Sequence, residues 1–415
     1  MSQQKRSNER RVVVTGMGCV TSLGLNVSDF WKNLLSGKSG ISNITSVNTS
    51  DLDVHFGGEI KNFDASLWIN KKDLRRMDRF IQLGLAASFQ AIEESKLDLL
   101  PDKRRIGVLL SSGIGGLSAI EESSVSLSQG KRLSPFFIPS IISNLLPGQL
   151  SILKGYKGAN FCITSACSSS AHSVGEGFRM IQRGDADAMV VGGSEAPLTR
   201  LSIAGFSAMK ALSTRNEFPE KASSPFDVNR DGFVMSEGAA TLILESLESA
   251  EKRGAPILAE VVGYGTNSDA YHMTAPTENG EGARECMEYA LADASLSPSQ
   301  IDYINMHGTS TSVGDVAESR AIATLIPEWK KHLLVSSTKS MTGHLLGAAG
   351  ALEALACVMA MREGRIPPTI NLHQQDPECP LDYVAHESRA HQMKAVMSNS
   401  FGFGGTNVSL VFKKI

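Results

Sequence analysis

The sequence predicts an α/β protein made of two similar halves, each with a mixed sheet flanked by helices. Short apolar runs that end in glycine alternate with helical patterns along the whole chain. The strand-then-glycine pattern of residues 12–18 also returns at residues 257–265, directly after Pro256. We therefore expect a duplicated fold, with residues 1–255 as the first half and residues 256–415 as the second.

The composition is that of an ordinary globular protein. Of the 415 residues, 42% are hydrophobic and 20% are charged, which is enough for two or more domain-sized cores. Lysine and arginine total 40 and aspartate and glutamate total 43, so the charge balance favours neither nucleic acid nor a membrane surface. No apolar run reaches about 18 residues, so no membrane span is expected. Residues 1–11 lack the apolar segment of a secretory signal.

The cysteine pattern argues against a metal site and against disulfides. Six cysteines are scattered along the chain, at positions 19, 162, 167, 286, 357 and 379, and no two of them form a Cys-x-x-Cys pair. Zinc-ribbon and thioredoxin motifs are thereby excluded. We expect reduced thiols and a cytoplasmic protein.

The first half begins with a buried strand and a glycine turn at residues 12–18. A dinucleotide-binding fingerprint would need a third glycine at position 21, where this chain has Thr21, so that fold is excluded. Residues 71–95 have helical periodicity, and strand 106–110 leads into a glycine loop at 111–116. Residues 135–139 form an apolar loop that we expect to be buried against a partner or a pocket. Further strands are expected at 188–193 and 240–245.

Cys167 is the candidate nucleophile of the first half. It lies between a short apolar run at 160–163 and a helical pattern that Gly184 ends. The unpaired N–H groups at a helix N-terminus can lower the pKa of a thiol below its free value of ~8.5, and they can bind an oxyanion. The alternative is that Cys167 is only a small core residue.

The second half is predicted to contain helix 282–294, strand 301–306, strand 333–336, helix 345–361 and a final strand pair. His307 follows the strand 301–306, at a sheet edge of the kind where α/β sites form. His344 opens the helix 345–361, whose dipole would keep the imidazole neutral and able to donate a hydrogen bond. Asp315 and Glu318 are expected to cap the helix that follows His307.

Two further features of the second half are relevant to chemistry. Glu353 is a lone acid on an apolar helix and needs a partner, for which Lys339 is the candidate. Most single histidines are structural, but one cysteine with two histidines suggests covalent acyl transfer. A cysteine protease would instead use one histidine and an orienting Asn or Asp. Two neutral donors fit the task of holding the enolate oxygen of a thioester.

The chain resembles the β-ketoacyl-acyl-carrier-protein synthases, the condensing enzymes of fatty-acid elongation in the thiolase-like superfamily. The resemblance extends from residue 12 to residue 407. It rests on three motifs taken together, Thr-Ser-Ala-Cys-Ser-Ser at 164–169, His-Gly-Thr-Ser-Thr at 307–311 and Lys-Ser-Met-Thr-Gly-His at 339–344. It implies a thiolase-like, five-layered αβαβα sandwich from two duplicated halves, which is usually a homodimer. It also implies no cofactor of its own and no metal, because phosphopantetheine arrives on the acyl carrier protein.

The resemblance implies a role for each residue of the central motifs. Cys167 would take the acyl chain as a thioester, with its own N–H and that of Phe403 as the oxyanion hole. His307 and His344 would stabilise the enolate that forms when the malonyl thioester loses CO2. That carbanion would attack the acyl-cysteine in a Claisen condensation. Lys339 would support the two histidines electrostatically, with Glu353 close to it.

Residues that bind the substrate and the carrier are implied in the same way. Thr309 and Thr311 would hydrogen-bond the phosphopantetheine arm, and Phe403 would gate the acyl pocket with Phe401 beside it. Ile114 resembles the isoleucine that guards this pocket in type II enzymes. Phe137 and Ile138 would line the pocket near the dimer interface. The proposed docking residues for the acidic carrier are Lys72, Arg75, Arg76, Lys210 and Arg215, although a charged run on a helix is more often a solvated face.

Several related activities are weighed against the type II synthase. A thiolase would need a second cysteine in the last glycine loop, where this chain has Phe403. Type III synthases have Asn at the position of His344. A type I synthase or a polyketide ketosynthase fits the same three motifs. A chain-length factor, which is a non-catalytic partner on this fold, lacks the nucleophile, and Cys167 therefore argues against it.

Overall fold

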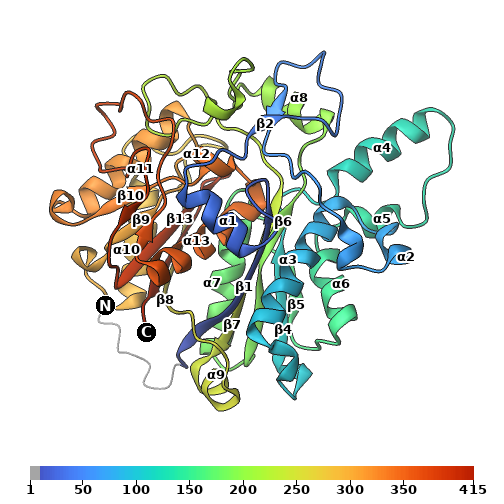
Figure 1. The fold of residues 1–415 in the computed structure, drawn as a ribbon, viewed down its shortest axis with the longest axis horizontal. Helices are drawn as coiled ribbons and strands as arrows, with labels where there is room; N and C mark the ends of the chain where they lie inside the picture. The colour runs from blue at the N-terminus through green and yellow to red at the C-terminus, as the bar shows by residue number, and fades with distance from the viewer. Residues whose placement is uncertain (1–9) are drawn as a thin grey trace.

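The computed structural model describes residues 10–415. A ten-stranded sheet crosses the molecule, in the order β10-β9-β13-β14-β8-β1-β7-β6-β4-β5 (Figure 1). Its strands are β1 (Val12–Thr21), β4 (Ile106–Ser111), β5 (Asn160–Phe161), β6 (Ala188–Glu195), β7 (Gly238–Ser246), β8 (Ala259–Ser268), β9 (Tyr303–Asn305), β10 (Leu334–Ser336), β13 (Ala395–Gly402) and β14 (Thr406–Lys413). Two small ladders lie outside it, β2 (Ser42–Asn43) with β3 (Phe56–Gly57) and β11 (Arg365–Ile366) with β12 (Arg389–Ala390).

The two halves of the large sheet have the same topology. From the outer edge inward, the first half runs β5-β4-β6-β7-β1 and the second runs β10-β9-β13-β14-β8. In both halves the three outer strands are parallel and the two inner pairings are antiparallel. The predicted duplication with mixed sheets is thereby confirmed.

The halves are not separate sheets, because β1 and β8 pair along part of their length. Val12 lies opposite Val261, and Val14 lies opposite Ala259. The division into domains at residues 255 and 256 stays a prediction. That point falls in the connection between helix α9 (Leu247–Arg253) and β8.

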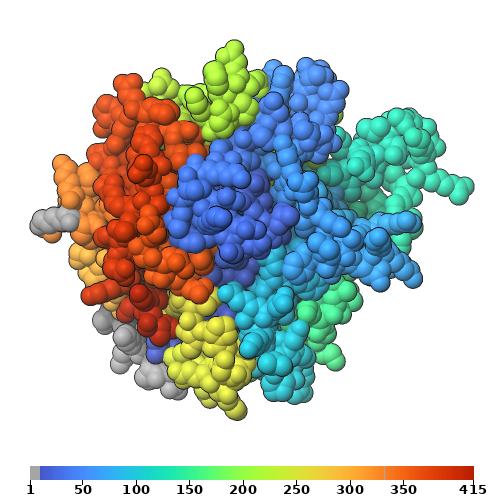
Figure 2. Space-filling model, viewed as in Figure 1, coloured from blue at the N-terminus to red at the C-terminus, as the bar shows by residue number. Residues whose placement is uncertain are grey.

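Helices cover both faces of each half-sheet. They are α1 (Val27–Leu35), α2 (Lys71–Leu74), α3 (Arg79–Ser95), α4 (Leu117–Ser128), α5 (Phe137–Ile141), α6 (Leu145–Lys154), α7 (Ser169–Gln182), α8 (Arg200–Ala208), α9, α10 (Glu281–Ala294), α11 (Ser312–Leu325), α12 (Lys339–Thr342) and α13 (Ala349–Glu363). In the space-filling view the α4 segment, in teal, projects from the body (Figure 2).

The side chains of each strand alternate between the two faces of the sheet, so helices pack on both faces and five layers result. Successive side chains of a strand point to opposite faces, so Val108 and Leu110 of β4 pack with α3, whereas Leu109 packs with α7 and α13. On the far side of the second half, Ile304 and Val335 pack with α10 and α11. The layers therefore run from α3, through one half-sheet, the central pair α7 and α13, and the other half-sheet, to α10 and α11 (Figure 1).

Small residues allow the central helices to approach each other. A Cβ added at Gly350 of α13 would lie 2.7 Å from the Cβ of Ala171 on α7 and 2.7 Å from the Oγ of Ser400. Thirteen consecutive residues of α13, from Ala349 to Met361, are buried, as its all-round apolar sequence predicts. The turn that carries Cys167 and the second-half loops can therefore come within reach of one another.

Two predicted helices differ from those observed. The predicted helix 71–95 is two helices, because Asp78 caps α3 by accepting a hydrogen bond from the N–H of Phe80 at 3.2 Å. The predicted helix 345–361 begins only at Ala349, after a 3-10 turn at Leu346–Ala348. His344 is therefore outside α13, and its backbone pairs with that of Val234.

Within residues 10–415, no helix combines the length and the apolar character that crossing a bilayer requires. The expectation that residues 1–11 hold no secretory signal falls almost wholly outside the described residues. All six cysteines are unpaired thiols, as predicted.

Candidate active site

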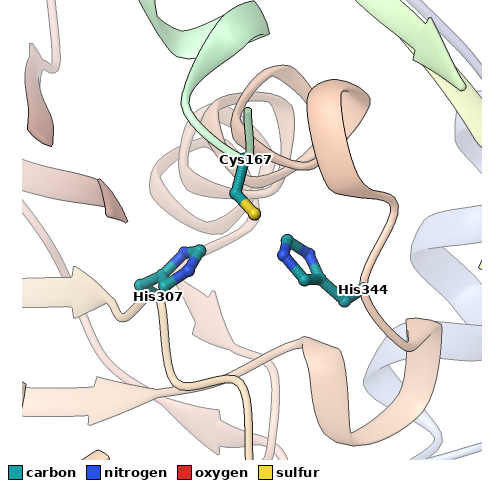
Figure 3. Close-up of side chains that lie close together, drawn as sticks. All are labelled: Cys167, His307 and His344. Atoms are coloured by element: carbon teal, nitrogen blue, oxygen red, sulfur yellow. The ribbon is translucent and has the colours of Figure 1, made fainter. Parts of the chain in front are cut away.

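Cys167, His307 and His344 meet at one point, although they come from different halves of the chain (Figure 3). One ligand atom of each side chain, the Cys167 sulfur and a nitrogen of each imidazole, lies within 4.8 Å of the others. The two imidazole rings are 5.4 Å apart between centroids and nearly perpendicular, at 85°. This juxtaposition is the one that the three sequence motifs lead us to expect.

Cys167 lies on a strained elbow directly before the N-cap of α7. The N-cap is Ser168, and Ala166 on the other side has φ +50°, in the left-handed region that costs about 1–3 kcal/mol for a residue with a side chain. The hydroxyl of Ser168 lies 3.0 Å from the carbonyl oxygen of Ser400 and 2.7 Å from that of Thr406. The elbow of the first half is thus held by the last strand pair of the second half.

The predicted lowering of the Cys167 pKa is wrong. Burial raises the pKa of this thiol to about 11, although the Lys339 ammonium and a hydrogen bond from the Phe403 N–H lower it in part. The carboxylates of Glu195 and Glu353 raise it further. Desolvation therefore affects the pKa of this thiol more than the helix N-terminus does, because Cys167 is only 8% exposed. The resting residue is therefore a thiol.

Both histidines are neutral, as predicted for His344, but for a different reason. Burial lowers the pKa of each imidazole well below its usual range, and the Lys339 ammonium lowers both further. The neighbouring His344 lowers the pKa of His307 as well. The helix dipole is not the cause, because His344 does not lie at the N-terminus of α13.

The imidazoles also have unused hydrogen-bonding capacity. Nδ1 of His307 and both ring nitrogens of His344 have no hydrogen-bond partner within the described chain. Since a neutral imidazole has one N–H, each ring can donate one hydrogen bond to a ligand atom placed between them.

Lys339 and Glu353 form the buried ion pair that the sequence predicts. The Lys339 Nζ donates to Glu353 Oε1, and both side chains are almost wholly buried. Burial raises the pKa of Glu353 to about 7, while the Lys339 charge opposes that shift. The pair places a cation near the reacting groups and keeps the net buried charge small.

Glu318 is a site residue that the sequence reasoning misassigned as a helix cap. Its two oxygens accept hydrogen bonds from the N–H groups of His307 and Gly308, both at 2.9 Å. Asn399 donates to it at 3.1 Å. Burial raises the pKa of Glu318 to about 7. The carboxylate therefore fixes the loop that carries His307, and its one sequence signal was an acid on a buried helix face.

Asp315 lies in the first turn of α11 and accepts hydrogen bonds from backbone N–H groups at the start of that helix, as expected of a capping residue, and it also holds a loop of the first half. It accepts hydrogen bonds from the N–H of Phe226 at 2.9 Å and from that of Ser310 at 3.2 Å. The N-cap of α11 is Thr311. Burial raises the pKa of Asp315 to about 6, and the nearby Arg230 lowers it in part.

The three central side chains open into a cavity of about 360 Å³. Thr309 and Thr311 lie on its wall, with their hydroxyl oxygens 3.1 Å apart. Ile114, Phe401 and Phe403 line it as well. The remaining lining is largely apolar and includes Phe206, Met209, Phe233 and Leu346. A long apolar chain with a polar, amide-bearing arm has suitable surfaces here.

Phe137 and Ile138 do not line this cavity within one chain. Phe137 borders a second cavity, together with Phe136 and Arg75, and the Ile138 side chain is 56% exposed. Both belong to α5, near the projecting α4 segment (Figure 1).

The five predicted docking residues fall into two groups. Lys210 is exposed, beside Met209 and Ala211 of the cavity wall, and Arg215 pairs with Asp231 at 3.6 Å. The other three lie on or directly after α2, and Figure 1 shows α2 well apart from α8, which precedes Lys210. Lys72 and Arg75 are exposed, whereas Arg76 lies over the Phe136 ring at 4.8 Å.

Comparison with known proteins gives two consistent findings. A family model for the N-terminal domain of β-ketoacyl synthases matches residues 9–250, and one for the C-terminal domain matches residues 258–373. A 3-oxoacyl-[acyl-carrier-protein] synthase 2 of Synechocystis sp. is 50% identical over 98% of both chains. Proteins of the same name in Vibrio cholerae and Staphylococcus aureus are 50% and 49% identical over 98% of this chain, and cover 100% and 99% of their own length.

Solved structures agree with the fold. A β-ketoacyl synthase from Burkholderia phymatum superposes with a TM-score of 0.91 at 37% identity, over 98% of this chain and 100% of that one. A chain of a type II PKS ketosynthase complex with its acyl-carrier protein has a TM-score of 0.90 at 34% identity, with the same coverage.

Proposed function

The chain belongs to the β-ketoacyl synthase family, and on that premise we propose that it is a type II 3-oxoacyl-acyl-carrier-protein synthase. It is an acyltransferase that lengthens a fatty acyl chain by a decarboxylative Claisen condensation. The observation that carries the proposal is one thiol beside two neutral, buried imidazoles with unpartnered nitrogens, at the wall of an apolar cavity. A protease site would need an orienting carboxylate or amide on one imidazole.

In the first step the sulfur of Cys167 attacks the thioester carbonyl of an acyl-carrier protein. A new carbon–sulfur bond forms to Cys167, the bond to the phosphopantetheine sulfur breaks, and the thiol proton passes to the leaving sulfur. We assign the oxyanion to the N–H groups of Cys167 and Phe403, and the second of these already hydrogen-bonds the sulfur. The acyl chain is then held covalently at the cavity wall.

In the second step the malonyl thioester loses CO2, and its bonding electrons become an enolate. His307 and His344 each donate one hydrogen bond to the enolate oxygen, which two neutral donors can do without gaining a proton first. The carbanion attacks the acyl carbonyl, a carbon–carbon bond forms, the bond from the acyl carbon to the Cys167 sulfur breaks, and the departing thiolate takes up a proton from the solvent. The Lys339 charge favours neutral imidazoles throughout.

The cavity wall supports the remaining substrate assignments. Thr309 and Thr311 offer two hydroxyls at the cavity wall to the phosphopantetheine amides, and Ile114 and Phe403 offer apolar surface there to the acyl chain. Phe401 packs 6.0 Å from the His307 ring, between centroids. No cofactor is required, since the carrier supplies the phosphopantetheine.

The partner is an acyl carrier protein, and we assign its landing surface to the two basic groups described above. Lys210 lies between Met209 and Ala211, which line the cavity of its own chain, and Arg215 follows five residues later in the sequence. Lys72, Arg75 and Arg76 would reach the same carrier from a second copy of the chain. A homodimer would also account for Phe137 and Ile138, which cannot line the acyl pocket of their own chain.

The homodimer is supported by an unpaired sheet edge. β5 ends the ten-stranded sheet and both of its residues are exposed. An edge strand of this kind offers free N–H and C=O groups to a second strand. The segment that leads into β5, residues 125–161, also exposes nine large apolar side chains, namely Val125, Leu127, Leu133, Phe136, Ile138, Ile142, Ile152, Leu153 and Phe161. We further place the enzyme in the cytoplasm, where free thiols such as Cys167 stay reduced.

An elongation assay tests this function. The purified chain is given malonyl-carrier protein and acyl-carrier proteins of graded length, and the 3-oxoacyl product is measured by mass spectrometry. We expect a product two carbons longer than each accepted acyl chain. A polyketide ketosynthase would instead extend a 3-oxo chain repeatedly. The 50% identity to a 3-oxoacyl-[acyl-carrier-protein] synthase 2, against 34% to the type II PKS chain, favours the single extension.

A further inference from the structure

Glu195 is a buried carboxylate that the reaction described above does not use. It is the last residue of β6, and its side chain is 1% exposed. Oε1 accepts hydrogen bonds from the Ser112 hydroxyl at 2.7 Å and the Ile114 N–H at 3.1 Å. Oε2 accepts hydrogen bonds from the N–H groups of Gly113 at 2.7 Å and Gly347 at 2.9 Å. Each oxygen therefore has two donors.

These donors belong to two loops that form the cavity wall. Residues 112–114 follow β4 and end in Ile114, whereas Gly347 lies in the 3-10 turn three residues after His344. The loops are in direct contact, since a Cβ added at Gly347 would lie 2.3 Å from the Gly113 nitrogen and 2.5 Å from Glu195 Oε2. The carboxylate thus joins the wall beside Ile114 to the loop that follows a catalytic histidine.

We propose that Glu195 is a positioning residue that fixes the backbone of residues 112–114, keeps Ile114 at the cavity wall, and so sets the preferred length of the acyl chain. The proposal rests on the proposed function. Ile114 can change rotamer without breaking any of the four bonds, but a shift of its backbone would leave a buried charge with fewer donors. Long acyl chains that need such a shift therefore bind at a cost that short chains avoid.

The test compares acyl transfer from hexanoyl- and tetradecanoyl-carrier protein in the full-length enzyme and in Glu195→Gln. Glutamine has the same shape, but in either orientation its NH2 would face at least one backbone N–H donor, from Ile114 at the place of Oε1 or from Gly113 and Gly347 at the place of Oε2, so the loop is held less firmly. We expect the ratio of kcat/KM for the long chain to that for the short chain to rise about fivefold, the effect that the net contribution of one ordinary hydrogen bond represents.

A double mutant shows whether the effect passes through Ile114. In an Ile114→Ala background the side chain that blocks the long chain is gone, so Glu195→Gln should no longer change the ratio. A folded Glu195→Gln enzyme with an unchanged ratio would overturn the proposal. So would an equal change in the Ile114→Ala background, because the effect would then not act through Ile114.

Two further variants separate positioning from general stability. Glu245→Gln removes another buried carboxylate, one that pairs with Arg253 at 2.6 Å, and it should lower the melting temperature without moving the ratio. If Glu195→Gln does not fold, Ser112→Ala removes a single donor from Oε1, and the ratio should rise about twofold. An unchanged ratio in Ser112→Ala would then count against the proposal. Failure of the unmodified enzyme to condense any chain would instead contradict the proposed function.

Discussion

The ammonium of Lys339 and the carboxylate of Glu353 pair inside the protein, 14 residues apart in sequence, where neither side chain is more than 3% exposed. Oε2 of Glu353 has no hydrogen-bond partner within residues 10–415, so Lys339 is the main compensation for this charge. The same ammonium lowers the pKa of both active-site histidines and of Cys167. One ion pair therefore serves both the stability and the electrostatics of the site.

Removing one partner of this pair should cost more than removing both. We expect Lys339→Met to lower the free energy of unfolding by about 3–5 kcal/mol, because it leaves a buried carboxylate unpaired. The double variant Lys339→Met with Glu353→Gln should recover most of that loss. Urea unfolding of the three proteins measures both effects, and equal destabilisation of the single and double variants would contradict this account.

The nucleophile and the histidines should affect different steps. Cys167→Ala should abolish acyl transfer and condensation, whereas His344→Ala should mainly abolish the loss of CO2 from malonyl-carrier protein. Release of labelled CO2 and formation of the acyl-enzyme are measured separately for each variant. If His344→Ala decarboxylated at the parental rate, the role assigned to this imidazole would be wrong.

Alkylation of Cys167 by iodoacetamide should accelerate with pH. Because the folded pKa is about 11, the thiolate fraction rises about tenfold per pH unit between pH 7 and pH 10. In Lys339→Met the cation that lowers this pKa is lost, so alkylation at a given pH should be slower. Mass spectrometry of the peptide that holds Cys167 follows the rate. An alkylation rate that stops rising near pH 8 would show that burial does not raise the pKa of the Cys167 thiol.

Docking of the acidic carrier should depend on Lys210. We expect Lys210→Glu to raise KM for the carrier substrate about tenfold at low salt, with kcat little changed and a smaller difference at high salt. Lys414→Glu, at the exposed C-terminus, is the matched charge control. Equal KM values for the two variants would place the docking surface elsewhere.

A second copy of the chain should cover β5. Phe161→Glu puts a charge on this exposed edge strand, where the side chain is 40% exposed in the single chain. We expect the unmodified protein to have the mass of a dimer in light scattering after gel filtration, and Phe161→Glu to shift it toward the monomer. Leu67→Glu, at a residue 78% exposed outside that region, should not change the mass. A monomeric unmodified protein would contradict the dimer.

The sequence alone determined the duplicated α/β architecture and the identity of the three central residues. Strand and helix periods are local properties, and the strand-to-glycine rhythm repeated on both sides of Pro256. It also predicted the pairing of Lys339 with Glu353, because a lone acid on an apolar helix requires a cation.

Only the tertiary structure decided the electrostatics and the positioning groups. The pKa of Cys167 depends on how completely the thiol is desolvated, which follows from packing between the two halves and not from its place beside α7. Glu318 and Glu195 hold active-site loops by accepting hydrogen bonds from backbone N–H groups. The donors to Glu318 come from the loop before its own helix, whereas those to Glu195 are distant in sequence. Hydrogen bonds to backbone leave no side-chain pattern, so no motif could have revealed them.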